Sequence, residues 1–204
     1  MAEREVKWAA AVAAFDRHHG DDPRAVTRDG GTTTWSRDYH ARVLAWVDRL
    51  DAHAPVHVRL AALCQHLRRW ESPREAYPEG VEGYKRWRAA AGLRQAELAT
   101  RELAAVGYDD ETIARTKDVL LKKKLKHDPD AALLEDAVCL RFVEDELVDF
   151  ARGREHAALL GIVRKTWDKM SARGRTAALA LVSAAPPRLP AEIAALLAEA
   201  VAEG

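Results

Sequence analysis

The chain has 204 residues, with 32 basic and 32 acidic side chains and therefore no formal net charge. This balance excludes a protein that binds nucleic acid or anionic membranes through its overall charge. The hydrophobic share of 48% is ordinary for a globular domain, and no apolar run reaches the length of a membrane-spanning helix. The two cysteines, Cys64 and Cys139, stand among apolar residues, and the first residues do not resemble a signal peptide. We therefore expect a cytoplasmic protein with a hydrophobic core.

Apolar residues recur at helical spacing along almost the whole chain, which predicts an all-α fold. Residues 20–34 are rich in breakers and predict a loop, or at most a small hairpin. Residues 71–83 are proline-rich and polar, and they predict an irregular crossing. The helices are expected at about residues 4–18, 36–51, 56–70, 84–106, 110–125, 129–151, 155–169, after Ser171, and 190–203.

Capping residues set several of these bounds. Ser36 is expected to cap the second helix, Gly107 to close the fourth, and Asp128 with Pro129 to open the sixth. The Pro186-Pro187 break separates a single domain, residues 1–185, from a terminal amphipathic helix, residues 186–204. We expect this last helix to pack either on the domain or on a second copy of the chain, as a homodimer contact.

Polar groups directly follow the most apolar stretch of the chain, in the segment LAALCQHLRRWESPR. On a helix, Gln65 lies one turn from Arg69, and His66 projects toward the irregular crossing. Together these arginines predict a cradle for an anion, formed by Arg68, Arg69, Arg74 and Arg88. The alternative is a buried histidine that is hydrogen-bonded in the core, with the arginines paired to Glu71 and Glu75.

Two carboxylates open a strongly apolar helix at Glu135 and Asp136. Asp136 shares a helical face with Cys139 and Val143, so we expect it to point partly inward. A buried carboxylate needs a metal, an arginine or hydrogen-bond donors. The alternative is that Asp136 compensates the helix dipole or forms a salt bridge.

The run Lys122 to Lys126 is either a solvated helix end or an anion site for phosphate or RNA. RNA is the less favoured partner, because basic residues are not spread over the rest of the chain. His40 taken by itself is a surface histidine. The sequence contains no HExxH, CxxC, P-loop or GxSxG string, so these mechanisms are set aside.

Six strings occur in an order that resembles one family: QHLRRWESPR, YPEGVEGYKRWR, VGYDDETI, KKKLKHDP, LEDAVCLRFVE and RKTWDKMS. The chain resembles the domain of unknown function 4202 family over about residues 36–180. The resemblance implies an HD-like helical bundle, here with an extra C-terminal helix. HD proteins bind divalent metal through a histidine, a His-Asp pair and a later aspartate, usually for phosphohydrolysis and sometimes for oxidation.

On this chain the resemblance places His40 at the first histidine, Gln65 and His66 at the His-Asp pair, and Asp136 at the last aspartate. The pair departs from the HD pattern, because glutamine is a poor metal ligand and histidine replaces the aspartate. The metal site is therefore expected to be rearranged, mononuclear or lost.

If the site is kept, His40, His66 and Asp136 are expected to hold Zn, Mn or Fe, with Glu71 or Glu135 as the general base. The predicted function is then metal-dependent hydrolysis of a small anionic, phosphorylated substrate. The residues expected to bind this substrate are Gln65, Arg68, Arg69, Arg88, Lys123 and Lys126. The alternatives are a metal-free ligand-binding or accessory protein, an Fe-dependent oxygenase and, less favoured, an RNA-binding protein.

Overall fold

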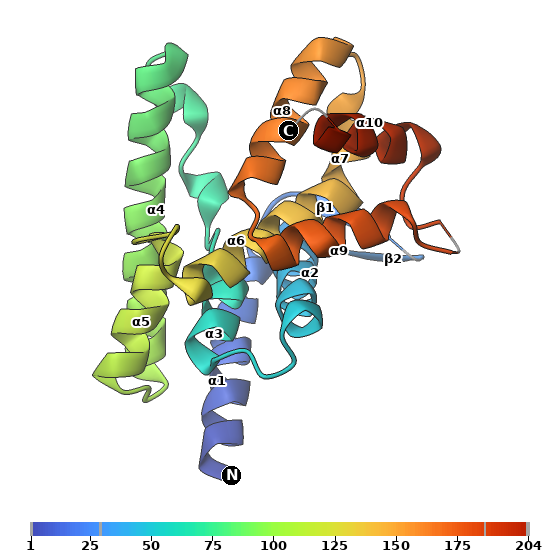
Figure 1. The fold of residues 1–204 in the computed structure, drawn as a ribbon. Helices are drawn as coiled ribbons and strands as arrows, with labels where there is room; N and C mark the ends of the chain where they lie inside the picture. The colour runs from blue at the N-terminus through green and yellow to red at the C-terminus, as the bar shows by residue number, and fades with distance from the viewer. Residues whose placement is uncertain (1, 29, 186, 203–204) are drawn as a thin grey trace.

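The computed structural model describes residues 2–28, 30–185 and 187–202, and in this part of the chain the fold is all-α apart from one short β-hairpin (Figure 1). The α-helices are α1 (Ala2–Gly20), α2 (Trp35–Leu50), α3 (Val56–Cys64), α4 (Gly80–Ala105), α5 (Asp110–Leu120), α6 (Pro129–Arg141), α7 (Leu147–Ala151), α8 (His156–Lys169), α9 (Ala172–Val182) and α10 (Ala191–Ala202). The remaining elements are β1 (Ala25–Arg28), β2 (Gly31–Thr34), the 3-10 turns η1 (Arg69–Glu71) and η2 (Arg74–Ala76), and the π-helix η3 (Phe142–Glu146).

Helix α2 occupies the middle of the molecule, where it packs against α3 and α6. The pair α4 and α5 runs along one side, while α8, α9 and α10 cover the other side (Figure 1). One core cluster joins α2 and α6 to α8–α10, and Val43, Val47 and Leu140 lie in it fully buried. A second cluster joins α1, α3 and α4 through Phe15, Leu60, Leu103 and their neighbours. Helices α2 and α6 therefore lie between the α4–α5 side and the α8–α10 side of the molecule.

Two of the three predicted caps are confirmed. Asp128 caps α6 by accepting from the Asp130 amide, with Pro129 as the first helical residue, and Gly107 follows α4 with a left-handed φ of 85°. The expected cap of α2 was wrong, because Thr34 accepts from the Arg37 amide in that role. Ser36 lies inside the helix, and its hydroxyl faces the buried His19 ring.

Two helices stop earlier than predicted. Helix α3 ends at Cys64 rather than near residue 70, and α5 ends at Leu120 rather than near residue 125. Arg68, Lys122 and Lys124 have φ between 51° and 54°, in the left-handed region that interrupts a helix. Since these residues are neither glycine nor asparagine, their sequence gives no signal of the interruption.

Three further segments refine the expected bounds. The segment expected as a loop or small hairpin contains the strands β1 and β2, with Val26 opposite Thr33 in an antiparallel pair. Helix α4 begins at Gly80, four residues before the expected start at 84, and Gly80 itself has a left-handed φ of 83°. The long helix expected over 129–151 is divided by the π-helix η3.

Helix α10 packs against α8 and α9 of the same chain. Its apolar residues Ile193, Leu196, Leu197 and Ala200 are buried there. The apolar face of α10, which was expected to pack either on the domain or on a second copy of the chain, is therefore covered by the domain itself. None of the described helices is both long enough and apolar enough to cross a membrane.

Candidate ligand-binding site

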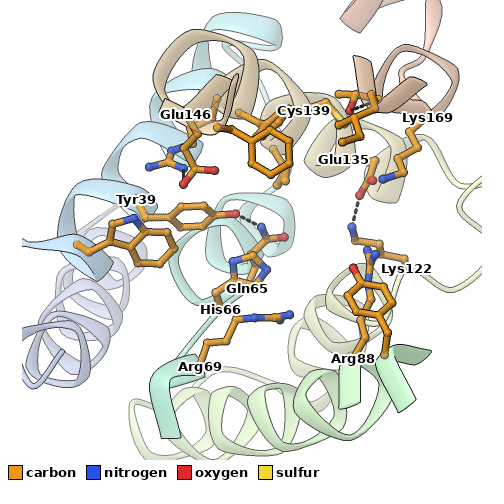
Figure 2. A pocket seen from close by; sticks show the side chains of 18 of the residues that line it. Tyr39, Gln65, His66, Arg69, Arg88, Lys122, Glu135, Cys139, Glu146 and Lys169 are labelled. Carbon is orange, nitrogen blue, oxygen red and sulfur yellow. Dashed lines mark hydrogen bonds and ion pairs between the residues drawn. The ribbon is translucent and has the colours of Figure 1, made fainter. Parts of the chain in front are cut away.

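A cavity of about 450 Å³ opens between the α4 side and the α8 side of the molecule (Figure 2). Its walls come from the start of α2, the segment after α3, α4, the turn after α5, the stretch from α6 to α7, and α8. This volume is in the range of sites for small organic ligands. Elements that are distant in the sequence therefore converge on one space.

Cationic side chains outnumber carboxylates in the lining. The cationic residues are Arg24, Arg69, Arg88, Lys122, Arg141 and Lys169, and the carboxylates are Glu135 and Glu146. Six positive against two negative charges leave an excess of four. An anion that enters this cavity is attracted by charge and is partly shielded from water.

Both carboxylates already have partners. Lys122 is paired with Glu135, which is buried in α6 (Figure 2). Arg141 is paired with Glu146. In the described part of the chain, Arg69, Arg88 and Lys169 form no ion pair. These three cations are therefore the ones whose charge remains for a ligand.

Arg69 and Arg88 lie close enough to affect each other. Burial lowers the pKa of Arg69, and the nearby Arg88 charge lowers it further. The Arg69 guanidinium is held over the Trp87 ring, with 4.5 Å from its carbon to the ring centroid. Figure 2 shows Arg69 pointing toward Arg88 and Lys122. An anion placed among these side chains would relieve the repulsion between them.

The end of α3 places Gln65 and His66 in the same cavity. The Gln65 amide donates to the Tyr39 hydroxyl (Figure 2), and the His66 ring stacks on Tyr39 with 5.0 Å between centroids. Burial and the Arg69 charge hold the pKa of His66 well below its ordinary range. His66 therefore faces the cavity as a neutral imidazole, and its Nδ1 has no hydrogen-bond partner among the described residues.

His40 is committed to the core and does not line this cavity. Its Nδ1 donates to the Ser36 carbonyl over 2.6 Å, and its Nε2 accepts from the His66 amide over 3.3 Å. Its ring also stacks on His19 with 4.0 Å between centroids. Because both nitrogens of His40 are in use, neither has a free lone pair for a metal ion.

Asp136 lies next to Glu135 in the sequence but faces a different helix. Its carboxylate accepts from the Ser171 amide over 2.7 Å and from the Ser171 hydroxyl, at the start of α9. The packing is so close that a Cβ at Gly174 would lie 2.3 Å from the carboxylate oxygen. Asp136 thus fixes the α9 N-terminus, and burial raises its pKa despite these donors.

The metal site expected from the resemblance does not fit these positions. The atoms of His40 and Asp136 that would ligate a metal form hydrogen bonds with Ser36, His66 and Ser171. Over the described ranges, no group of three or more His, Cys, Asp and Glu side chains could hold a metal ion. The structure therefore does not bring His40, His66 and Asp136 together as a ligand set.

The other predicted residues divide into two groups. Gln65, His66, Arg69, Arg88 and Glu135 line the cavity. The residues placed outside its lining are His40, Arg68, Glu71, Arg74, Lys123, Lys126 and Asp136. Among these, Arg68 pairs with Asp21 and Glu71, and Lys123 pairs with Asp118, so their charges are used on the surface.

Several lining residues were not predicted from the sequence. Arg141 is one of them, with 2% of its surface exposed and its guanidinium 4.5 Å from the Tyr39 ring centroid. The π-helix η3 begins at the next residue and turns Phe142 and Glu146 toward the cavity. The aromatic wall is formed by Trp35, Tyr39, Tyr84, Phe142 and Phe150. An arginine within an apolar helical segment is unusual, and this signal at Arg141 could have located the wall from the sequence.

Comparison with protein families gives a match. A family model described as "Domain of unknown function (DUF4202)" matches residues 9–194, a range that includes every residue of the cavity lining. No curated protein and no solved structure matches the chain.

Proposed function

The chain belongs to the DUF4202 family, and we propose that it binds a small anionic organic molecule in the cavity between α4 and α8. The observation that carries this proposal is the excess of cationic side chains in an open cavity with aromatic walls. Binding needs no metal ion in this account.

The anionic part of the ligand is best accommodated beside Arg69, Arg88 and Lys122. Two of these side chains have no ion-pair partner in the described ranges, and the third is balanced by one glutamate. Arginine offers a planar set of donors that matches phosphate and carboxylate oxygens. A phosphoryl or carboxylate group in this position would gain charge-assisted hydrogen bonds from several donors at once.

The organic part of the ligand is best accommodated by the aromatic wall. Trp35 and Tyr39 are stacked with 4.8 Å between centroids, and Phe142 and Phe150 meet edge to face at 5.6 Å. Flat apolar surfaces of this kind bind an aromatic or heterocyclic ring. Together the two regions favour an aryl or nucleoside-like anion over inorganic phosphate.

Metal-dependent hydrolysis, Fe-dependent oxidation and the HD relationship remain predictions from the resemblance. The proposal does not depend on them, because the atoms of His40 and Asp136 that would ligate a metal have other partners. RNA binding is also not needed, because Lys123 is paired on the surface and the free cations face a small cavity.

Isothermal titration calorimetry with phenyl phosphate and thymidine monophosphate, in buffer with a metal chelator, tests this proposal. We expect both to bind, with thymidine monophosphate the tighter ligand because it fills more of the cavity. Arg88→Ala should weaken binding about tenfold, the usual cost of losing a charge-assisted hydrogen bond.

Arg86→Ala is the matched control, because Arg86 is exposed on the same helix and does not line the cavity. This variant should bind within about twofold of the parent, a shift too small to reflect a lost direct contact. If neither probe binds, or if both variants lose affinity equally, the anion-binding function is wrong.

A further inference from the structure

A second hollow of about 410 Å³ runs between α4 and the end of α5, next to the cavity. Its lining consists of Tyr84, Lys85, Arg88, Ala89, Gly92, Leu120, Leu121 and Lys122. We refer to it as the α4–α5 groove. Tyr84, Arg88 and Lys122 line both the groove and the cavity. The two spaces therefore meet at one aromatic ring and two cations.

The chemistry changes on either side of these shared residues. The cavity has aromatic walls and holds Arg69 and the neutral His66, whereas the rest of the groove is mainly aliphatic. Gly92 borders open space in the groove, since a Cβ built there meets nothing within 4 Å. The junction is thus positively charged, and each side of it can accept an uncharged organic group.

The backbone at the junction supports a binding role. Lys122 has a φ of 53°, an unfavourable conformation for a residue with a side chain, and such residues concentrate at functional sites. Its ammonium is paired with Glu135 on the cavity side, while the exposed Arg88 forms no ion pair within the described residues. An anion at the junction would therefore meet one free guanidinium and one already oriented ammonium.

We propose that the ligand is a small phosphodiester whose phosphoryl group lies between Arg88 and Lys122. One ester substituent then occupies the cavity and the other occupies the α4–α5 groove. A phosphomonoester has only one substituent, so it would leave one of the two spaces empty. This inference rests on the proposed anion-binding function and adds the class of the ligand to it.

Two diesters of equal charge test the proposal. The methyl ester and the p-nitrophenyl ester of thymidine monophosphate each carry one negative charge, and they differ only in the second substituent. Calorimetric titration of the whole chain should give about tenfold tighter binding for the p-nitrophenyl ester, because its ring is buried in the groove.

Gly92→Trp fills the groove with a large side chain and should abolish this preference, so that the two esters bind within about twofold of each other. Ala89→Phe fills the same groove from another position and provides the test if Gly92→Trp does not fold. The control is Ala104→Trp, an exposed position of α4 outside both spaces, which should keep the tenfold preference.

The outcomes separate the two proposals. If both esters bind with equal affinity to the parent chain, the diester assignment is overturned while the anion-binding function stands. If neither ester nor thymidine monophosphate binds, both are overturned. A short single-stranded oligothymidylate that binds far more tightly than either ester, with a steep dependence on salt, would also overturn the assignment in favour of a nucleic acid.

Discussion

His40 and His66 are joined by a hydrogen bond, yet only one of them can meet a ligand. His40 uses both ring nitrogens inside the core, whereas His66 presents a neutral ring to the cavity. The family resemblance that suggested two metal ligands is equally compatible with one core residue and one cavity residue. The difference depends on Ser36 and on the backbone after α3, neither of which the histidines themselves reveal.

His19 gives a pH-dependent prediction at this scale. Burial lowers its pKa to about 4, from 6.5 in an unfolded chain. Between these values the unfolded chain binds the extra proton, so the stability supplied by the neutral ring is lost as the pH falls through this window. The free energy of unfolding should therefore be lower at pH 5 than at pH 7.5, with about 2 kcal/mol of the decrease due to His19.

Urea denaturation of the parent and of His19→Gln at the two pH values measures this contribution. The variant should lose less stability on acidification than the parent does. His53→Gln, at an exposed position after α2, serves as the control and should follow the parent. An acid sensitivity that is identical in His19→Gln and the parent would show that the His19 ring does not titrate as described.

Single residues of the site were only partly predictable. Gln65, His66 and Arg69 were identified because polar groups directly follow an apolar helix. Asp136 was expected to point inward and does so, but it points to Ser171. Which neighbour a buried carboxylate meets depends on how α6 and α9 pack, and a sequence pattern on one helix does not contain that information.

At the scale of the elements, the site is built by interruptions of helices. The left-handed residues Arg68 and Lys122 follow the ends of α3 and α5 beside the cavity. The π-helix η3 interrupts the helical segment that begins with α6. The spacing of apolar residues located the helices themselves, because each helix buries one face along its whole length and its apolar residues recur with the helical period. The interruptions were missed because tertiary contacts, such as the pairing of Arg68 with Asp21, stabilise them.

Helix α4 offers a test of how the irregular crossing is held. A Cβ at Gly83 would lie 1.8 Å from the Pro78 carbonyl oxygen, so the crossing packs directly on the first turn of the helix. Gly83→Ala should therefore destabilise the protein by about 2 kcal/mol or more, through displaced backbone. Gly92→Ala, where the added methyl group has open space, should stabilise it by up to about 1 kcal/mol.

Thermal unfolding followed by circular dichroism compares these two variants. We expect a lower melting temperature for Gly83→Ala and an equal or higher one for Gly92→Ala. A Gly83→Ala variant as stable as the parent would mean that the crossing does not contact α4 in the way described.

At the scale of the whole molecule, a balanced charge conceals a local excess. The chain carries 32 basic and 32 acidic side chains, but its cavity is lined by six cations and two carboxylates. The sequence located part of this excess, in the arginines that follow α3. The contributions of Arg141 and Lys169 depend on how α6 and α8 pack in the first core cluster, which a count of charges along the sequence does not show.

A crystal structure of the complex with thymidine monophosphate tests the central claim most directly. We predict the phosphoryl group in contact with Arg88 and the base against the aromatic wall, with no metal between His66 and Asp136. A ligand bound outside the cavity, or a metal ion coordinated by His66, would contradict the account.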